Sequence, residues 1–179
     1  MSNQNSSILK NFKIESTFVL LCVIIGVLTN IINGAISPYY FRITMHWFNT
    51  EIRLKCIVQG IYEGFLYGIC FAIIFSVGFG LITKGKANYA FAFKHILRIA
   101  LIVIICWTIG GLLAVMLVRL SPEFYRSHFP WTPTDVIEQM KYAWVGGSIW
   151  GEIFGGFLGS VLGLIAVKNN WVNKVSIES

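Results

Sequence analysis

Apolar residues run through four long stretches of the chain, separated by short polar segments. The stretches cover residues 16–36, 57–83, 99–120 and 142–167. Each has at least the roughly 20 residues with which a helix crosses a hydrocarbon core about 30 Å thick. Open backbone in lipid would leave polar groups unpaired, and the stretches lack the alternating polarity of membrane barrel strands. The pattern therefore predicts an all-α membrane protein with four transmembrane helices.

Composition agrees with this class. Apolar residues make up 56% of the chain and charged residues 12%, whereas soluble domains carry about 25% charged residues. Four spans leave little room for a soluble catalytic domain, so residues 1–179 are expected to form a single integral membrane domain. The polar ends, residues 1–9 and 169–179, are expected to be mobile tails.

Basic residues beside the spans predict the orientation, because cytoplasmic loops are enriched in Lys and Arg. One side would carry eight of them: Lys10, Lys13, Lys84, Lys86, Lys94, Arg98, Lys168 and Lys174. The other side would carry six: Arg42, Arg53, Lys55, Arg119, Arg126 and Lys141. Both termini are therefore predicted to be cytoplasmic, in a multi-pass protein of the cell membrane. Because the positive charge flanks apolar segments instead of forming one basic face, nucleic acid is not expected as a partner.

The chain resembles itself at an offset of 84 residues, so that residues 10–84 align with residues 94–168 without a gap. Fifteen of the 75 pairs are identical. Apolar composition would produce some matches inside the spans, but not a shared series of polar residues in the loops. We interpret this as a duplication of a two-helix unit. Because each unit has an even number of spans, both copies would enter the membrane in the same sense, as a parallel tandem repeat.

The loops share a motif of Ser-Pro followed by Arg, Trp and Thr at fixed spacing. The matched residues are Ser37, Pro38, Arg42, Trp47 and Thr50, and then Ser121, Pro122, Arg126, Trp131 and Thr134. Serine before proline is typical of a helix start, since serine caps the free amides and proline lacks one. A short helix is expected after each proline. Two interpretations stay open: aromatic anchoring at the membrane surface, or paired lids in which the arginines bind an anionic group.

Small residues recur every fourth position in the second and fourth spans. The residues assigned to helix packing are Gly64, Gly68, Ala72, Ser76, Gly147, Gly151, Gly155, Gly156, Gly159 and Gly163. Residues four apart lie along one face of a helix, and small side chains let helix backbones approach closely in lipid. The second and fourth helices are thus predicted to form the centre, with Phe71, Phe75 and Phe79 facing lipid or the other two helices.

Two acidic residues, Glu63 and Glu152, lie inside predicted spans. A charged carboxylate there costs at least a few kcal/mol, so a partner or a function is expected. Together with Ser148 they form the candidate intramembrane polar site. Each acid could instead be structural: Glu63 at the interface, bonded to a loop, and Glu152 protonated and bonded to a neighbouring helix. Nearby donors are Tyr62, Tyr67, Tyr142 and Trp150.

The sequence shows no nucleophile and base pair, phosphate loop, nucleotide fingerprint or metal-ligand spacing, so neither an enzyme nor a cofactor is expected. The four cysteines, Cys22, Cys56, Cys70 and Cys106, are expected to pack as small apolar residues. The preferred hypothesis is a non-enzymatic, glycine-packed membrane module that forms a homo-oligomer or joins other membrane subunits in the lipid bilayer. The alternative is a small permease or channel that uses the buried acids to pass a proton, a cation or a small polar solute.

Overall fold

In the computed structural model, which describes residues 2–48 and 51–178, the chain is all-helical. It has four long helices, α1 (Ser2–Ile36), α3 (Ile52–Thr83), α4 (Tyr89–Leu120) and α6 (Val136–Glu178). Two short helices, α2 (Pro38–Thr44) and α5 (Pro122–His128), lie between α1 and α3 and between α4 and α6. No strand occurs in the described residues. All four long helices are long and apolar enough to span a membrane, over Leu9–Ile36, Ile52–Thr83, Tyr89–Leu120 and Val136–Lys174. The predicted all-helical class with four long apolar helices is confirmed.

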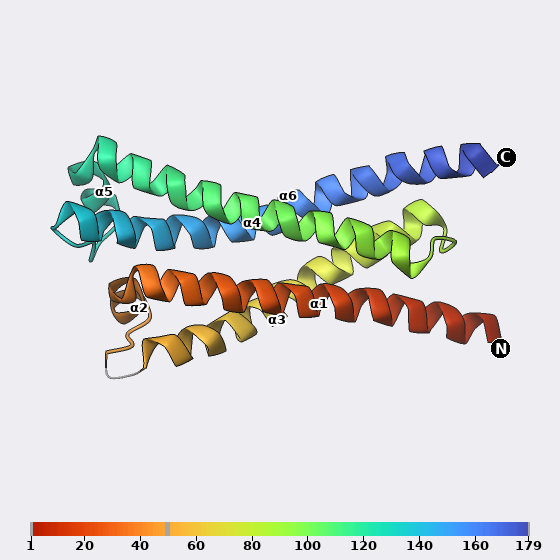
Figure 1. Cartoon of the computed structure of the whole chain (residues 1–179), viewed down its shortest axis with the longest axis horizontal. Coiled ribbons are helices and arrows are strands. Elements are labelled where there is room, and N and C mark those ends of the chain that lie inside the picture. Colours follow the sequence, from red (N-terminus) through yellow and green to blue (C-terminus); the bar gives the residue numbers. More distant parts are fainter. Residues whose placement is uncertain (1, 49–50, 179) are drawn as a thin grey trace.

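The long helices run up and down and form two hairpins, α1 with α3 and α4 with α6 (Figure 1). One end of the bundle holds both chain termini and the turn between α3 and α4, and we call it the terminal end. The opposite end holds α2 and α5, and we call it the α2/α5 end. Of the segments expected to be polar tails, residues 2–9 continue α1 and residues 169–178 continue α6 as helix. Extending an existing helix costs far less than nucleating a new one.

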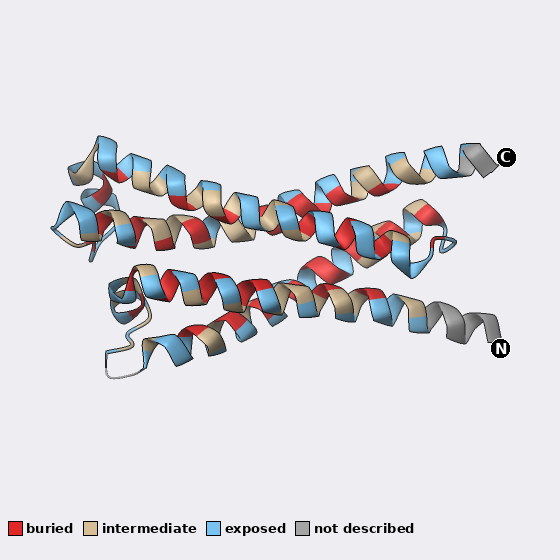
Figure 2. Ribbon diagram, viewed as in Figure 1, coloured by how far each residue is buried: buried red, intermediate tan, exposed pale blue. Residues whose placement is uncertain are grey.

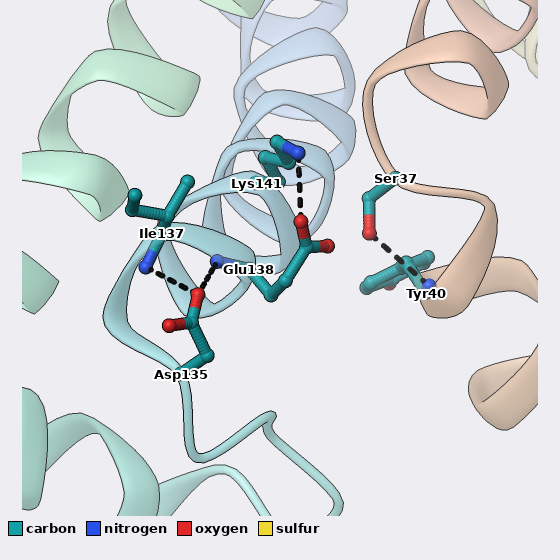
Figure 3. Close-up of polar contacts among 6 residues, drawn as sticks. All are labelled: Ser37, Tyr40, Asp135, Ile137, Glu138 and Lys141. Carbon is teal, nitrogen blue, oxygen red and sulfur yellow. Dashed lines mark hydrogen bonds and ion pairs between the residues drawn. The ribbon is translucent and has the colours of Figure 1, made fainter.

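Local sequence sets where the helices begin and end. Short helices follow both Ser-Pro pairs, as expected. Ser37 caps α2, since its hydroxyl accepts a hydrogen bond from the Tyr40 amide, whereas Ser121 makes no such bond (Figure 3). Asp135 precedes α6, and its carboxylate accepts bonds from two amides of the first turn. At the other end, α3 stops where Lys84 and Gly85 adopt positive φ, a conformation that glycine takes without strain.

Each hairpin is held by glycine contacts within itself. In the first, a Cβ added at Gly64 would lie 2.6 Å from the Cys22 carbonyl oxygen. In the second, a Cβ at Gly151 would collide with the carbonyl oxygen of Cys106. The expectation that the glycine rows bring α3 and α6 together at the centre is therefore wrong for most of their length, because these glycines face α1 and α4. Consecutive antiparallel helices with short connections are the natural neighbours.

The two hairpins use matching contacts, but with a different register from that of the ungapped alignment. That alignment equates Gly64 with Ser148 and Gly68 with Glu152. In the structure, Gly64 and Gly68 pack on Cys22, whereas the glycines on Cys106 are Gly151 and Gly155. The first helices of the two hairpins, α1 and α4, thus correspond at an offset of 84 residues. The second helices, α3 and α6, correspond in their packing at an offset of 87 residues.

The remaining residues assigned to packing are also in contact with neighbouring helices. Gly147 packs on Gly110 and Ala114, while Gly159 and Gly163 pack on Ile99, all across the α4–α6 hairpin. Between the hairpins, the ring of Phe71 lies against Gly156. Ala72 is buried in the apolar core, whereas Ser76 bonds to another helix.

Phenylalanine rings fill the bundle toward the terminal end. Phe71, Phe75 and Phe79 are buried on α3 and pack with Phe18 of α1 and Ile96 of α4. The sequence left two environments open for these phenylalanines. Contact with the first and third helices is confirmed, and exposure to lipid is wrong. Buried positions lie on faces turned toward other helices, and much of the outer surface is exposed and apolar (Figure 2). This distribution is compatible with a membrane protein, whose outer surface contacts lipid.

Candidate functional site

A partly open cavity of about 60 Å³ lies between the four long helices, all of which line it. Most of its wall is aliphatic or aromatic, including Phe18 of α1 and Ile99 of α4. The two exceptions with charge are Glu63 of α3 and Glu152 of α6, which both reach this cavity. The structure therefore brings together the two acids that the sequence singled out on separate helices.

Glu63 is held by two side-chain amides. Asn30 of α1 donates through Nδ2 to one carboxylate oxygen at 3.1 Å, and Gln59, one turn earlier on α3, donates through Nε2 to the other at 2.7 Å. Both oxygens thus have a neutral donor, which is the arrangement that stabilises an ionised carboxylate without a cation. The alternative that Glu63 bonds to a loop is wrong, because its partners are α1 and its own helix.

Glu152 has a sparser environment. Thr29 of α1 lies within hydrogen-bonding reach of it, and the Thr29 hydroxyl donates to the carbonyl oxygens of Ile25 and Gly26. Among the described residues no Lys, Arg or His forms an ion pair with either Glu152 or Glu63. Two carboxyl groups therefore share one apolar cavity, one of them fixed by amides and the other with a free face toward the cavity.

Ser148 lies one turn from Glu152, toward the α2/α5 end of α6. It is fully buried, and its hydroxyl hydrogen is shared between Oδ1 of Asn33 at 3.1 Å and the Val145 carbonyl of its own helix at 3.0 Å. We call the polar side chains around the two acids on this side of the cavity the polar layer. Its members are Thr29, Asn30, Asn33, Gln59 and Ser148.

The donors proposed from the sequence are mostly wrong. Tyr62 and Trp150 are 60% and 63% exposed on the outer surface, and Tyr142 packs with the aromatic residues of α2. Only Tyr67 lines the cavity. The actual donors, Asn30 and Gln59, were missed although the sequence contains a signal.

That signal is a run of polar residues inside the first span. Asn33 lies three residues after Asn30 and four after Thr29, so the three side chains share one helical face. An amide in hydrocarbon is costly without a partner, which makes such a face a marker of a polar contact between helices.

A third acid on a long apolar helix, Glu15 of α1, lies outside the cavity. It precedes by one residue the apolar run that begins at residue 16. The Ser76 hydroxyl donates to its carboxylate at 2.9 Å and links α1 to α3 near the terminal end. Glu15 was missed because the apolar run only becomes continuous after it.

The residues of the loop motif lie together at the α2/α5 end, but the two copies differ in their contacts. Trp47 stacks on Phe41 with ring centroids 5.5 Å apart, whereas Trp131 is 76% exposed. Arg42 and Arg126 are exposed and make no ion pair in the described part of the chain. Thr50 lies outside the described residues, and Thr134 lines a shallow outer groove with Tyr39 and Asp135.

Tyrosines join the two hairpins at this end. Tyr40 of α2 packs on Tyr142 of α6 with ring centroids 4.9 Å apart. Burial raises the pKa of Tyr40 to about 12, and the neighbouring Tyr142 and Glu63 add to the effect. Burial also raises the pKa of Tyr125 on α5. Both phenols are therefore neutral at physiological pH and act in packing and hydrogen bonding.

Comparison of the chain with models of protein families, with curated proteins and with solved structures found no match.

Proposed function

We propose that this chain is a multi-pass membrane protein that binds a proton at the Glu63–Glu152 cavity and passes it, as a small permease or channel. The observation that carries the proposal is that two carboxyl groups share one intramembrane cavity with no basic partner among the described residues. Ionisable residues inside spans are expensive and mark ion or proton paths in membrane proteins.

Charge balance supports a cationic ligand. Two ionised carboxylates in a low-dielectric cavity repel each other, and desolvation adds to the cost. Glu63 is stabilised as an anion by Asn30 and Gln59. Glu152 then needs either a proton or a bound cation to remain in the same cavity.

The size and chemistry of the cavity favour a proton. Its volume of about 60 Å³ accommodates a few waters, since one water needs at least about 10–15 Å³ measured in this way. Pockets for drug-sized ligands have volumes of about 300–1,000 Å³. A metal cation would need about six oxygen ligands, whereas both oxygens of Glu63 already accept amide bonds.

Self-association through the glycine rows has less support than binding at the cavity. The glycines that would let a second copy approach closely are occupied by α1 and α4 of the same chain. A homo-oligomer or a complex with other membrane subunits remains an expectation based on the sequence. The proposal assigns binding and passage in the lipid bilayer, with no catalysed reaction and no nucleic acid.

Two further parts of the proposal concern origin and orientation. The matched packing of Cys22 with Gly64 and Cys106 with Gly151 supports a duplicated two-helix unit, with three extra residues before the glycine row of the second copy. The basic segment from Lys84 to Arg98 supports a cytoplasmic location for the terminal end of the bundle, in a protein of the cell membrane.

Proton flux into liposomes tests the function. The purified protein is reconstituted with an entrapped pH-sensitive dye, and a potassium gradient with valinomycin supplies the driving potential. Wild-type protein is expected to pass protons, and Glu152→Gln is expected to reduce the rate by at least about tenfold, because the amide cannot exchange a proton. Glu138→Gln is the matched control, since Glu138 lies on the same helix in a surface pair with Lys141. No flux above that of empty liposomes, or equal flux in Glu152→Gln, would contradict the proposal.

A further inference from the structure

The polar layer lies on one side of the cavity only. Along α1, the cavity-lining segment runs from Phe18 to Ile25, and Thr29, Asn30 and Asn33 follow it toward the α2/α5 end. On α6, Ser148 precedes Glu152 in the same direction. Thr29, Asn30, Asn33 and Ser148 are all at most 5% exposed, so they form an internal polar region and not a polar surface.

Two groups of this layer have no hydrogen-bond partner among the described residues. Asn30 uses its amide nitrogen for Glu63 and for the Gly26 carbonyl, which leaves its carbonyl oxygen free. Asn33 accepts from Ser148 and leaves its amide nitrogen free. One buried acceptor and one buried donor are therefore available beside the acids. Unpaired buried groups of this kind are the usual partners of internal water.

The opposite side of the cavity is closed by aromatic rings. Phe71 lies with its ring edge against Gly156, so close that any side chain at Gly156 would collide with it. Phe157 meets the same ring edge-on, with centroids 5.1 Å apart. Farther toward the terminal end, Phe75 is fully buried and packs on Phe18 at 5.7 Å. Ile96 and Ile99 join these rings in one apolar cluster, and an apolar constriction of this kind excludes water.

From this contrast we propose that Glu152 exchanges its proton with the α2/α5 end of the bundle only, through water held by the Asn30, Asn33 and Ser148 side chains, while Phe71 seated on Gly156 closes the terminal end. The inference rests on the proposed function, because it assigns the side from which the proton-binding site is reached. Asn33 and Ser148 are positioning residues in this route, and Phe71 is its closed gate. The proton itself moves between water and the Glu152 carboxyl, with no net change of bonds elsewhere.

One-sided chemical modification tests the route without a transport assay. Membrane vesicles of both orientations are treated with a membrane-impermeant, water-soluble carbodiimide and glycinamide, and modification of Glu152 is measured by mass spectrometry of its peptide. An impermeant amine reagent identifies the exposed face in the same sample, since Lys141 lies at the α2/α5 end and Lys86 at the terminal end. Modification of Glu152 is expected only where Lys141 is also modified. Modification from both faces, from the terminal face alone or from neither face would overturn the inference.

Two pairs of variants locate the route. Ser148→Ala is expected to slow modification of Glu152 by about tenfold, the effect of losing one hydrogen bond in the path. Ser160→Ala is its matched control, because Ser160 is also buried on α6 but bonds only to the Gly156 carbonyl of its own helix. Equal rates in the two serine variants would contradict the role of the polar layer.

The second pair concerns the gate. Phe71→Leu is expected to permit modification from the terminal face, whereas Phe154→Leu, on the exposed outer face of α6, is expected to leave it one-sided. A Phe71→Leu protein that stays one-sided would remove Phe71 as the gate. If modification is one-sided but wild-type protein passes no protons, the access route stands and the proposed function fails.

Discussion

The two hairpins share their packing but not their polarity. Cys22 with Gly64 in the first hairpin corresponds to Cys106 with Gly151 in the second. On the first helix of each hairpin, however, Thr29, Asn30 and Asn33 of α1 stand where α4 has Leu113, Ala114 and Leu117. The polar residues of α1 reach Glu63 on their own hairpin and Ser148 on the other.

This difference separates the residues that two helices need in order to pack from the residues that form the polar site. Close approach of two helices in lipid requires small residues at the crossing, and both hairpins have them. Buried amides are not needed for that purpose, since α4 packs on α6 without any at the corresponding positions. The polar face of α1 is therefore an addition to the packing unit, and it lies beside the two acids of the cavity.

The largest effect is expected from breaking what the hairpins share. Gly64→Ala and Gly151→Ala each place a methyl group against a backbone carbonyl of the facing helix, which cannot move without separating the helices. Each variant is expected to lose about 3 kcal/mol of stability, the upper range for overpacking. Unfolding in mixed detergent micelles at increasing dodecyl sulfate measures this loss.

Gly80→Ala is the control for both variants. Gly80 lies on α3, and a Cβ there would meet nothing within 4 Å. Its substitution is expected to leave stability unchanged or to raise it slightly, since alanine favours helix. A loss in only one of the two hairpins would show that their glycine contacts are not equivalent.

Much of the fold could be predicted from the sequence. The apolar runs gave four helices, because lipid leaves the backbone few alternatives, and the Ser-Pro pairs gave α2 and α5. The partner of each glycine row could not be predicted, since Gly64 and Gly151 lie on small-residue faces that fit any helix. The register of the second hairpin could not be predicted either, because identities at the helix ends, such as Lys84 with Lys168, favour the ungapped alignment.

The candidate site was predicted in part. Glu63 and Glu152 stood out by their cost in a membrane, but their convergence depends on how the hairpins are placed against each other, which no local pattern encodes. The donors depend on the same placement: Tyr62, next to Glu63, is exposed on the outer surface, whereas Asn30 comes from another helix.

A smaller loss is expected from making α1 resemble α4. Asn30→Ala introduces the residue that α4 has at the matching position, and it removes a hydrogen bond to the Glu63 carboxylate. A bond to a charged group contributes about 1.5–3 kcal/mol, so a loss of about 2 kcal/mol is expected in the same unfolding assay. The proton flux should fall as well, because Glu63 loses the donor that stabilises its ionised form.

The reverse exchange sharpens this result. Ala114→Asn adds an amide to α4, where Gly147 already packs on the Ala114 methyl group. It should destabilise the α4–α6 hairpin by overpacking and give no gain in flux. A gain in flux would show that an amide on either first helix can serve the acids.

Another difference between the hairpins lies nearer the terminal end and predicts an effect of about 1 kcal/mol on the free energy of unfolding. Ser76 of α3 and Ser160 of α6 match in the ungapped alignment, but Ser76 donates to Glu15 of α1 whereas Ser160 donates to the Gly156 carbonyl of its own helix. The counterpart of Glu15 on α4 is Ile99. Ser76→Ala should therefore cost about 1 kcal/mol of unfolding free energy, and Ser160→Ala less. Equal losses would show that the bond between α1 and α3 adds nothing to stability.

The smallest effect concerns the tyrosines at the α2/α5 end and appears only at alkaline pH. Tyr40 of α2 stands where α5 has Phe124, and burial raises its pKa from 10.0 to about 12. Below about pH 10 the phenol is neutral in both the folded and the unfolded chain, so its contribution to stability is constant. Between about pH 10 and 12 the unfolded chain releases the proton while the folded chain retains it, and stability must fall over this window.

Tyr40→Phe removes this titration while it preserves the ring that packs on Tyr142. The variant should match wild type at about pH 8 and lose less stability at about pH 11, in unfolding curves measured at both values. Tyr125, whose pKa is also raised by burial, remains in both proteins and supplies the common part of the alkaline loss. Parallel losses in the two proteins would mean that water reaches Tyr40 in the folded state, and the tyrosine contact between the hairpins would then be more open than the structure shows.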